Sequence, residues 1–218
     1  MPVSSAVPLP ACLKIVPACV GQRTLRCRAT AIGYDFSRGR LDSTVHPFEV
    51  SQNVDDVRIT TRFNESFISA ALFGTLHESG HGMYEQGVDP ALSRTALTTD
   101  LPGMYAVGGT SFGTHESQSR LFENHVGRSH AFWSNHYPAL QAAFPEGLSD
   151  VSGEEFYEAV NVCQPSFIRV EADELHYDFH IMMRVEIEVP RLPVTSTSSI
   201  RRLARIMLLK HPELTQID

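Results

Sequence analysis

Two histidines four residues apart, with a glutamate directly after the first, are the residues of this sequence best suited to chemistry. They form the pattern H-E-x-x-H at His77, Glu78 and His81. Residues four apart share one face of a helix, with Cβ atoms about 6 Å apart, so both imidazoles can bind one zinc ion. Glu78 can accept a proton from a water that the metal activates. The pattern predicts a zinc-dependent hydrolase, and the alternative is two surface histidines beside a helix carboxylate.

A catalytic zinc needs a third protein ligand and an open position. The extended pattern H-E-x-x-H-x-x-G-x-x-H is not present, because Tyr84 and Gly87 stand at its glycine and third histidine. We therefore expect a carboxylate from a later helix. Glu116 and Glu123, seven residues apart, both qualify, and spacing does not choose between them. Either could instead pair with Arg120.

The elements expected to position these residues are mainly helical, with one small β element. Two short β-branched segments, 46–50 and 57–63, are typical of strands joined by a polar turn. Apolar periodicity and capping residues predict four helices, over 67–86, from Thr114 to about 137, from Ser152 to about 163, and over 166–189. A last basic amphipathic segment spans 200–210.

The composition is that of an ordinary globular protein. The 218 residues are 42% hydrophobic and 20% charged, and the excess of acidic over basic side chains gives a net charge of −7. This balance argues against a nucleic-acid partner, which needs clustered Lys and Arg. No apolar stretch approaches the length that spans a membrane. The four cysteines form no CxxC pair, which favours reduced thiols in an intracellular protein.

The first 33 residues differ in composition from the rest. They contain four basic residues and no Asp or Glu, and they are interrupted by prolines. We expect an irregular arm, either a disordered leader or a transit peptide. The first alternative predicts a cytoplasmic protein, and the second a protein of the mitochondrion or plastid.

Six short segments together carry a resemblance to a known family. In order they are 34–42 (YDFSRGRLD), 46–48 (HPF), 56–60 (DVRIT), 77–81 (HESGH), 115–120 (HESQSR) and 168–173 (IRVEAD). They resemble the successive motifs of the carboxypeptidase Taq family of zinc metallocarboxypeptidases, and the resemblance covers roughly residues 32–189. Each motif alone is weak, but six in the same order are specific.

The resemblance implies a fold, an activity and a set of roles. Proteins of that family are helical zinc enzymes that remove single residues from peptide C-termini and usually form homodimers. By resemblance, His77, His81 and Glu116 are the zinc ligands and Glu78 is the general base, so the choice of Glu116 over Glu123 rests on the resemblance. We expect a mainly α, zincin-like metallopeptidase core with a small β element.

The substrate of such an enzyme is a peptide with a free C-terminus, and its carboxylate must be held. Arginine binds a carboxylate through a bidentate fork. Arg58 and Arg169 are the arginines within matched motifs that we expect to do so, and the alternative is a structural ion pair with Asp56 or Asp173.

Two further histidines, His46 and His115, also lie within matched motifs. They could donate hydrogen bonds to the substrate or support the metal ligands from behind. The alternative is that both are structural. Four histidines outside the motifs, His125, His130, His136 and His211, are expected at the surface.

The departures from the family define the alternatives. Its members are more than twice as long, and nothing here matches their later G-x-x-Q-D-x-H-W motif. We therefore expect a partial catalytic core over 34–189, followed by a divergent segment over 190–218. One alternative function is an inactive fragment that keeps the metal site. Another is a di-metal helical protein that binds two metals per chain. Its ligands would be Glu78, His81, Glu116, Glu123, Asp173 and His176.

Overall fold

The computed structural model describes residues 18–64, 67–95, 112–165, 168–169 and 172–188. The chain divides into two compact units, Met1–Asn161 and Val162–Asp218. The elements of the first unit are α1 (Ala18–Ile32), β1 (Gly39–Ser43), β2 (Glu49–Asn53), β3 (Asp56–Thr61), α2 (Ile68–Gln86), a 3-10 turn (Pro90–Leu92), α3 (Phe112–Arg120), a π-helical segment (Leu121–Val126), α4 (His130–Ala143), α5 (Pro145–Leu148) and α6 (Gly153–Val160). The second unit contributes α7 (Glu174–Glu188). None of the described helices is long and apolar enough to cross a membrane.

A small sheet supports the longest helix. Its strand order is β1-β3-β2, with β1 parallel and β2 antiparallel to β3. Along β3, Val57 and Ile59 alternate with more polar residues and are fully buried, as a strand with one covered face requires. The two predicted strands are confirmed with shifted bounds. The sequence gives little indication of β1, because Leu41 is its only large apolar residue.

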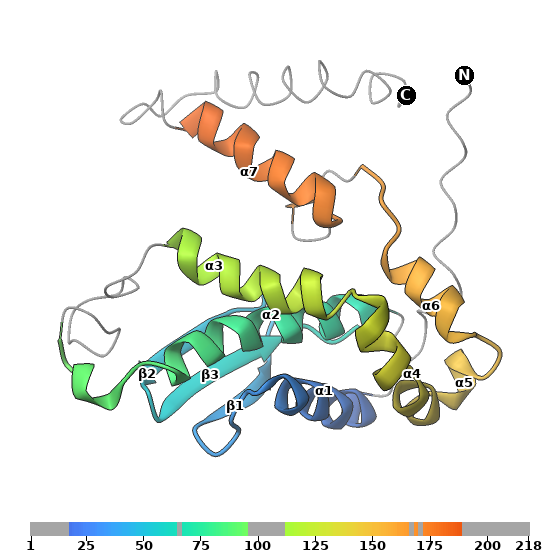
Figure 1. The fold of residues 1–218 in the computed structure, drawn as a ribbon, viewed down its shortest axis with the longest axis horizontal. Coiled ribbons are helices and arrows are strands. Elements are labelled where there is room, and N and C mark those ends of the chain that lie inside the picture. The colour runs from blue at the N-terminus through green and yellow to red at the C-terminus, as the bar shows by residue number, and fades with distance from the viewer. Residues whose placement is uncertain (1–17, 65–66, 96–111, 166–167, 170–171, 189–218) are drawn as a thin grey trace. The chain divides into compact units, whose positions relative to one another are not determined.

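Helix α2 lies between this sheet and α3, as Figure 1 shows. Leu72 and Leu76 are fully buried, and Thr61 of β3 donates a hydrogen bond to the carbonyl of Ala71 (3.1 Å). The predicted helix over 67–86 is therefore confirmed. Because α2 is covered on two sides, even its polar positions are largely buried, which matters for the site below.

The predicted continuous helix from 114 to 137 is wrong. The structure has α3, the π-helical segment and α4, with a break over 127–129. The amide of Gly127 donates to the carbonyl of Phe122, five residues back, as π geometry requires. A Cβ at Gly127 would lie 2.5 Å from a methyl carbon of Leu76, so glycine is needed where the chain turns against α2. Ser129 then caps α4 by accepting from the amide of Phe132.

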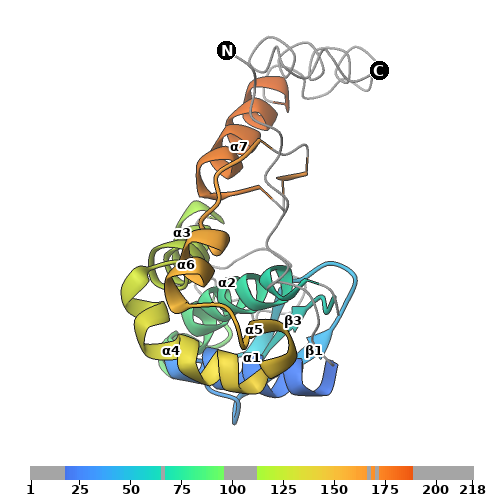
Figure 2. The same ribbon diagram turned by 90° about the vertical axis from the view of Figure 1, so that its right-hand side faces the viewer.

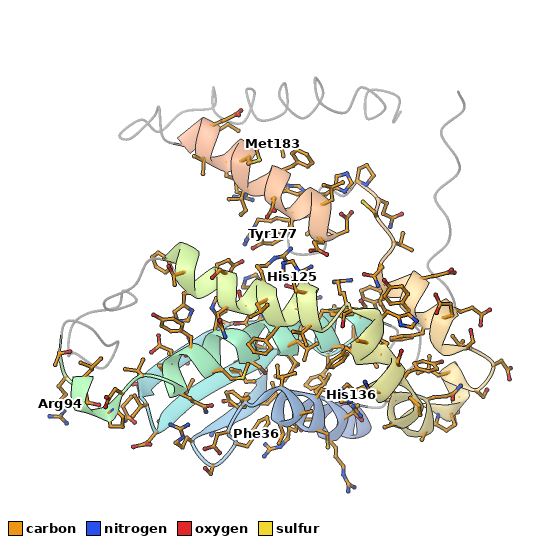
Figure 3. All side chains as sticks on the ribbon, in the orientation of Figure 1. Phe36, Arg94, His125, His136, Tyr177 and Met183 are labelled. Atoms are coloured by element: carbon orange, nitrogen blue, oxygen red, sulfur yellow. The ribbon has the colours of Figure 1, made fainter. Side chains whose placement is uncertain are left out.

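The first unit also contains a cluster of packed aromatic side chains on α4 and α6. Helix α4 packs against both α6 and α1, and Figure 2 shows it between them. Trp133 and Phe156 pack edge to face, with ring centroids 4.7 Å apart. His136, labelled in Figure 3, contacts Arg28 of α1. The capping box predicted at Ser152 and Glu155 is confirmed at the start of α6.

The expectation of an irregular N-terminal arm needs correction. An irregular arm over 1–33 is wrong for residues 18–32, which form α1 and bury Leu25 and Ala29 in the core. The four prolines of the arm all precede α1, the last directly before its first residue, where proline is compatible with a helix start. Residues 1–17, with the leader hypothesis, and the segment 200–210 lie outside the described residues.

The predicted helix over 166–189 also begins later than expected. Helix α7 starts at Glu174, because Asp173 caps it by accepting from the amides of Leu175 and His176.

Candidate metal centre

The site is built where α3 crosses α2 at very short range. A Cβ on Gly80 would lie 2.6 Å from the Cα of Ser119 and 2.8 Å from the carbonyl oxygen of Gln118. No residue larger than glycine fits there without moving one helix. Ser119 is fully buried and donates to the carbonyl of Glu116 (2.7 Å). The contact therefore brings Glu116, one turn earlier on α3, against the face of α2 that carries His77 and His81.

Three donor atoms converge across this contact. The carboxylate oxygen Oε2 of Glu116 lies 3.2 Å from Nε2 of His81 and 3.6 Å from Nε2 of His77. All three donor atoms are within 4.8 Å of one another, and all three side chains are partly buried. Two imidazole nitrogens and one carboxylate oxygen are a donor set that suits zinc with an open position. The residues present therefore fit the metal expected from the sequence.

Glu123 lies on the other side of His77. Its Oε2 accepts a hydrogen bond from Nδ1 of His77 (2.8 Å) and one from Arg120 (3.0 Å), and its second oxygen is 3.8 Å from Arg128. Burial is the largest single effect on both partners and opposes their charging, but the hydrogen bond between them and the neighbouring opposite charges together outweigh it. The pKa of His77 is raised and that of Glu123 is lowered. Both carboxylates that the spacing allowed are thus close to His77, Glu116 near Nε2 and Glu123 at Nδ1.

His81 is supported by a second histidine. Its Nδ1 is 2.5 Å from Nδ1 of His115, whose Nε2 is 2.9 Å from Oε1 of Glu85. The His115 and Glu85 side chains are only 5% and 6% exposed. Burial lowers the pKa of His81, which favours the neutral imidazole that a metal ligand must be.

Glu78 is buried beside these residues without being one of the converging donors. It is 7% exposed, and burial raises its pKa to about 7; His77 opposes this shift, while Glu49, Glu116 and Glu123 add to it. A pKa close to neutrality allows this carboxyl group both to accept and to release a proton.

The predicted substrate residues of the first unit are not among the converging donors. Arg58 forms a bidentate ion pair with Asp56, both contacts at 2.7 Å, which is the alternative that the sequence left open. His46 is exposed in the connection between β1 and β2. His115, in contrast, is fully enclosed behind His81.

Arg169 belongs to the second unit. It donates to the hydroxyl of Tyr177 (2.9 Å) and lies over that ring, rather than pairing with Asp173.

A second group of possible metal ligands, Cys163, Asp173 and His176, also lies in the second unit. Both oxygens of Asp173 already accept hydrogen bonds, one from two amides at the start of α7 and the other from the amide of Gln164 and from His176. Capping of α7 accounts for this group without a metal.

Sequence reasoning did not identify Glu85 and Glu49. Glu85 follows His81 by four residues on the same predicted helix, so its helical spacing from His77 and His81 was a usable signal. Glu49 offered none, because it reaches this region through the sheet.

The comparison with protein families matches residues 17–193 to the Carboxypeptidase Taq (M32) metallopeptidases, well over half of the chain. The chain belongs to this family. M32 relatives include Carboxypeptidase 1 of Bacillus subtilis (strain 168), 50% identical over 157 residues, which are 72% of this chain and 30% of that protein. Thermostable carboxypeptidase 1 of Thermus thermophilus is 49% identical over 73% of this chain and 29% of its own length.

Solved M32 structures share the fold. The M32 carboxypeptidase from Deinococcus radiodurans R1 superposes with a TM-score of 0.75 at 44% identity, over 84% of this chain and 35% of that one. The mainly helical fold with a small sheet is thereby confirmed. The chain spans about 30% of the length of the curated relatives that it matches. Membership of a metallopeptidase family implies a metal cofactor, and the metal's identity and the residue roles are proposals.

Proposed function

We propose that this chain carries the zinc site and the general base of a carboxypeptidase that releases single residues from peptides with a free C-terminus. The observation that carries the proposal is the convergence of His77, His81 and Glu116 from two helices on one point. Family membership supports the class of reaction. The relatives named above are carboxypeptidases, which supports peptides as substrates.

The roles follow from what each side chain can do. His77 and His81 present Nε2, and Glu116 presents one carboxylate oxygen, to a single zinc ion. Bound zinc supplies a Lewis acid that polarises the scissile carbonyl and acidifies water. Glu78 accepts the proton of the attacking water and later passes it to the leaving amine. Its burial beside the ligands keeps this proton away from bulk solvent.

The substrate carboxylate is assigned to Arg58 and Arg169, as the resemblance suggests. Arg58 is partly exposed and would exchange Asp56 for the substrate carboxylate. His46 is the remaining exposed donor proposed for the substrate. A homodimer, which the resemblance also implies, stays a prediction.

A single metal is better supported than a di-metal site. Among the described residues, the group of converging donors around His77 does not include Glu78 or Glu123. Glu123 instead forms the hydrogen bond to His77. The aspartate and histidine required by the di-metal alternative are used at the start of α7.

The decisive experiment replaces Glu78 with Gln, which keeps size and removes the basic oxygen. Zinc should stay bound, while hydrolysis of a peptide with a free C-terminus falls roughly 10²- to 10⁴-fold. The same peptide with an amidated C-terminus should be left largely uncut by both the wild type and Glu78→Gln. Glu154→Gln, at an exposed position of α6, is the matched control and should change neither property.

Two results would overturn the proposal. Loss of zinc in Glu78→Gln would make Glu78 a ligand and favour the di-metal alternative. A wild-type chain that binds zinc but cleaves neither peptide would identify the inactive alternative.

A further inference from the structure

The two histidines of the metal centre are held from behind in different ways. Nδ1 of His77 meets a carboxylate directly, at Glu123. Nδ1 of His81 meets another imidazole nitrogen, Nδ1 of His115. Because two nitrogens can share only one proton between them, this second contact forces a choice of which ring carries it.

The contact between His115 and Glu85 decides which of the two rings carries the shared proton. Glu85 offers Oε1 to Nε2 of His115, and an ionised carboxylate only accepts hydrogen bonds. His115 therefore donates from Nε2, and a ring with that single proton has a bare Nδ1. This nitrogen can accept from Nδ1–H of His81. The remaining nitrogen of His81, Nε2, is then available to bind a metal together with Oε2 of Glu116, 3.2 Å away.

The surroundings keep this arrangement from rearranging. His115 is 4% exposed, and the ring of Tyr84 lies against it with centroids 4.7 Å apart. Both of its nitrogens are occupied within the protein, so neither is left for a substrate. A buried network of this kind is strong only when every member is satisfied, and here each nitrogen has one partner.

We propose that His115 and Glu85 are positioning residues, which fix His81 in the tautomer that presents Nε2 to the metal. The inference rests on the metal centre of the proposed function. It replaces substrate contact as the role of His115, and it gives Glu85 a role that the sequence motifs do not indicate.

Zinc affinity provides the first test. Removing the acceptor with His115→Leu should weaken zinc binding about 10- to 100-fold, as loss of a supporting partner behind a metal-bound histidine typically does. His115→Asn should restore most of the affinity, because its side-chain carbonyl oxygen can take the place of Nδ1 as acceptor. Affinity is measured on the full chain by competition with a chromogenic chelator.

A matched control comes from a histidine–glutamate pair outside the centre. His130 contacts Glu154 at 3.1 Å, and both side chains are 61% exposed. His130→Leu should leave zinc affinity unchanged. If His115→Leu proves poorly folded by circular dichroism, Glu85→Leu with Glu85→Gln tests the same contact. The Gln carbonyl can still accept from Nε2–H of His115, so Gln should bind zinc better than Leu.

The tautomer itself provides a test that needs neither metal nor activity. Nitrogen NMR of ¹⁵N-histidine-labelled, metal-free protein distinguishes a ring protonated on Nδ1 from one protonated on Nε2. His81 should carry a larger share of the Nδ1–H form in the wild type than in His115→Leu, where the contact of its Nε2 with Glu116 meets no competing acceptor at Nδ1.

The outcomes separate the two proposals. An unchanged share of the Nδ1–H form of His81 in His115→Leu, or His115→Leu binding zinc as tightly as the wild type, overturns the positioning role and leaves the metal centre intact. A wild-type chain that binds no zinc overturns the proposed function, and the tautomer measurement still decides the positioning role.

Discussion

Glu116 and Glu123 illustrate how two residues of one type, in one stretch of sequence, take different roles. Both lie near His77, but Glu116 also reaches His81, whereas Glu123 is surrounded by His77, Arg120 and Arg128. A carboxylate already flanked by two guanidinium groups is a poor candidate for a metal ligand and a good one for orienting an imidazole. The two roles therefore predict that replacing Glu116 and replacing Glu123 weaken zinc binding by different factors.

Replacing Glu116 with Gln should weaken zinc binding by well over the roughly 100-fold upper limit for a supporting residue. Glu123→Gln should cost about 10- to 100-fold, because Gln can still accept from Nδ1 of His77 but loses the charge. Zinc dissociation constants from chelator competition provide the comparison. Equal losses in the two variants would contradict the assignment of ligand and support.

Glu49 gives a prediction about pH. Burial raises its pKa to about 7, with a hydrogen bond from Ser51 opposing and the charge of Glu85 adding. The folded protein therefore holds a proton that the unfolded chain releases above about pH 4.5. The stability this proton confers is present at low pH and is lost as the pH rises toward 7 and beyond.

Glu49→Gln imitates the protonated form, so the variant and the wild type should be nearly equal in stability at pH 5. At pH 8 the variant should be more stable by about 1–3 kcal/mol. Denaturant unfolding at the two pH values, with the metal removed by a chelator, measures the difference. A difference that does not grow with pH would show that Glu49 ionises freely.

At the scale of elements, the metal centre depends on how closely α2 and α3 approach. Both helices supply donors, and the backbone of α3 lies against Gly80. Another glycine of α2, Gly74, has room for a methyl group, since a Cβ there would make only ordinary van der Waals contacts, the shortest at 3.6 Å. Alanine substitutions at the two positions therefore distinguish the effect of helix propensity from the effect of the distance between α2 and α3.

Gly80→Ala should force the helices apart, destabilise the protein by about 1–3 kcal/mol and weaken zinc binding. Gly74→Ala should stabilise it by roughly 0.5–1 kcal/mol, because alanine favours helix more than glycine does, and zinc affinity should not change. Thermal unfolding and zinc titration measure both effects. Gly80→Ala with wild-type zinc affinity would show that Glu116 is positioned by something other than this contact.

The same elements show where sequence reasoning succeeds and where it stops. Helix α2 was predictable because its period and its H-E-x-x-H pattern agree. The break after α3 was not, because nothing local marks Gly127, whose role is to let the chain pass Leu76 at close range. Helix α1 was missed because the prolines before it were given more weight than Leu25 and Ala29, the apolar positions that it buries.

At the scale of the whole molecule, the converging donors and the supporting residues identified among the described ones belong to the first unit. The unit ends at Asn161, which donates to the carbonyl of Arg128 and so closes the chain back on the segment after α3. The sequence predicted the donor set through local motifs. It also suggested that His115 could support a ligand, but it did not indicate the contact of His115 with Glu85, which joins α3 to α2 across 30 residues of sequence.

A chain ending at Asn161 should therefore fold and bind one zinc ion with the affinity of the full chain, while His77→Ala in the same background should bind none. Metal content after gel filtration and a zinc titration provide the check. A large loss of affinity on truncation would mean that the second unit supplies a ligand.

The π-helical segment Leu121–Val126 has a consequence for insertions and deletions. A π turn holds one residue more than an α turn, so the segment contains a residue that an ordinary helix would not need. Deleting one residue there would allow regular α-helix, a change that local energetics favours. It would also remove the wide turn that ends in the hydrogen bond from the amide of Gly127 to the carbonyl of Phe122, and so change how Gly127 passes Leu76 of α2. The number of residues in this segment is therefore constrained, whatever their identity. Most single substitutions at its exposed positions should be tolerated, whereas deletion of one residue should not.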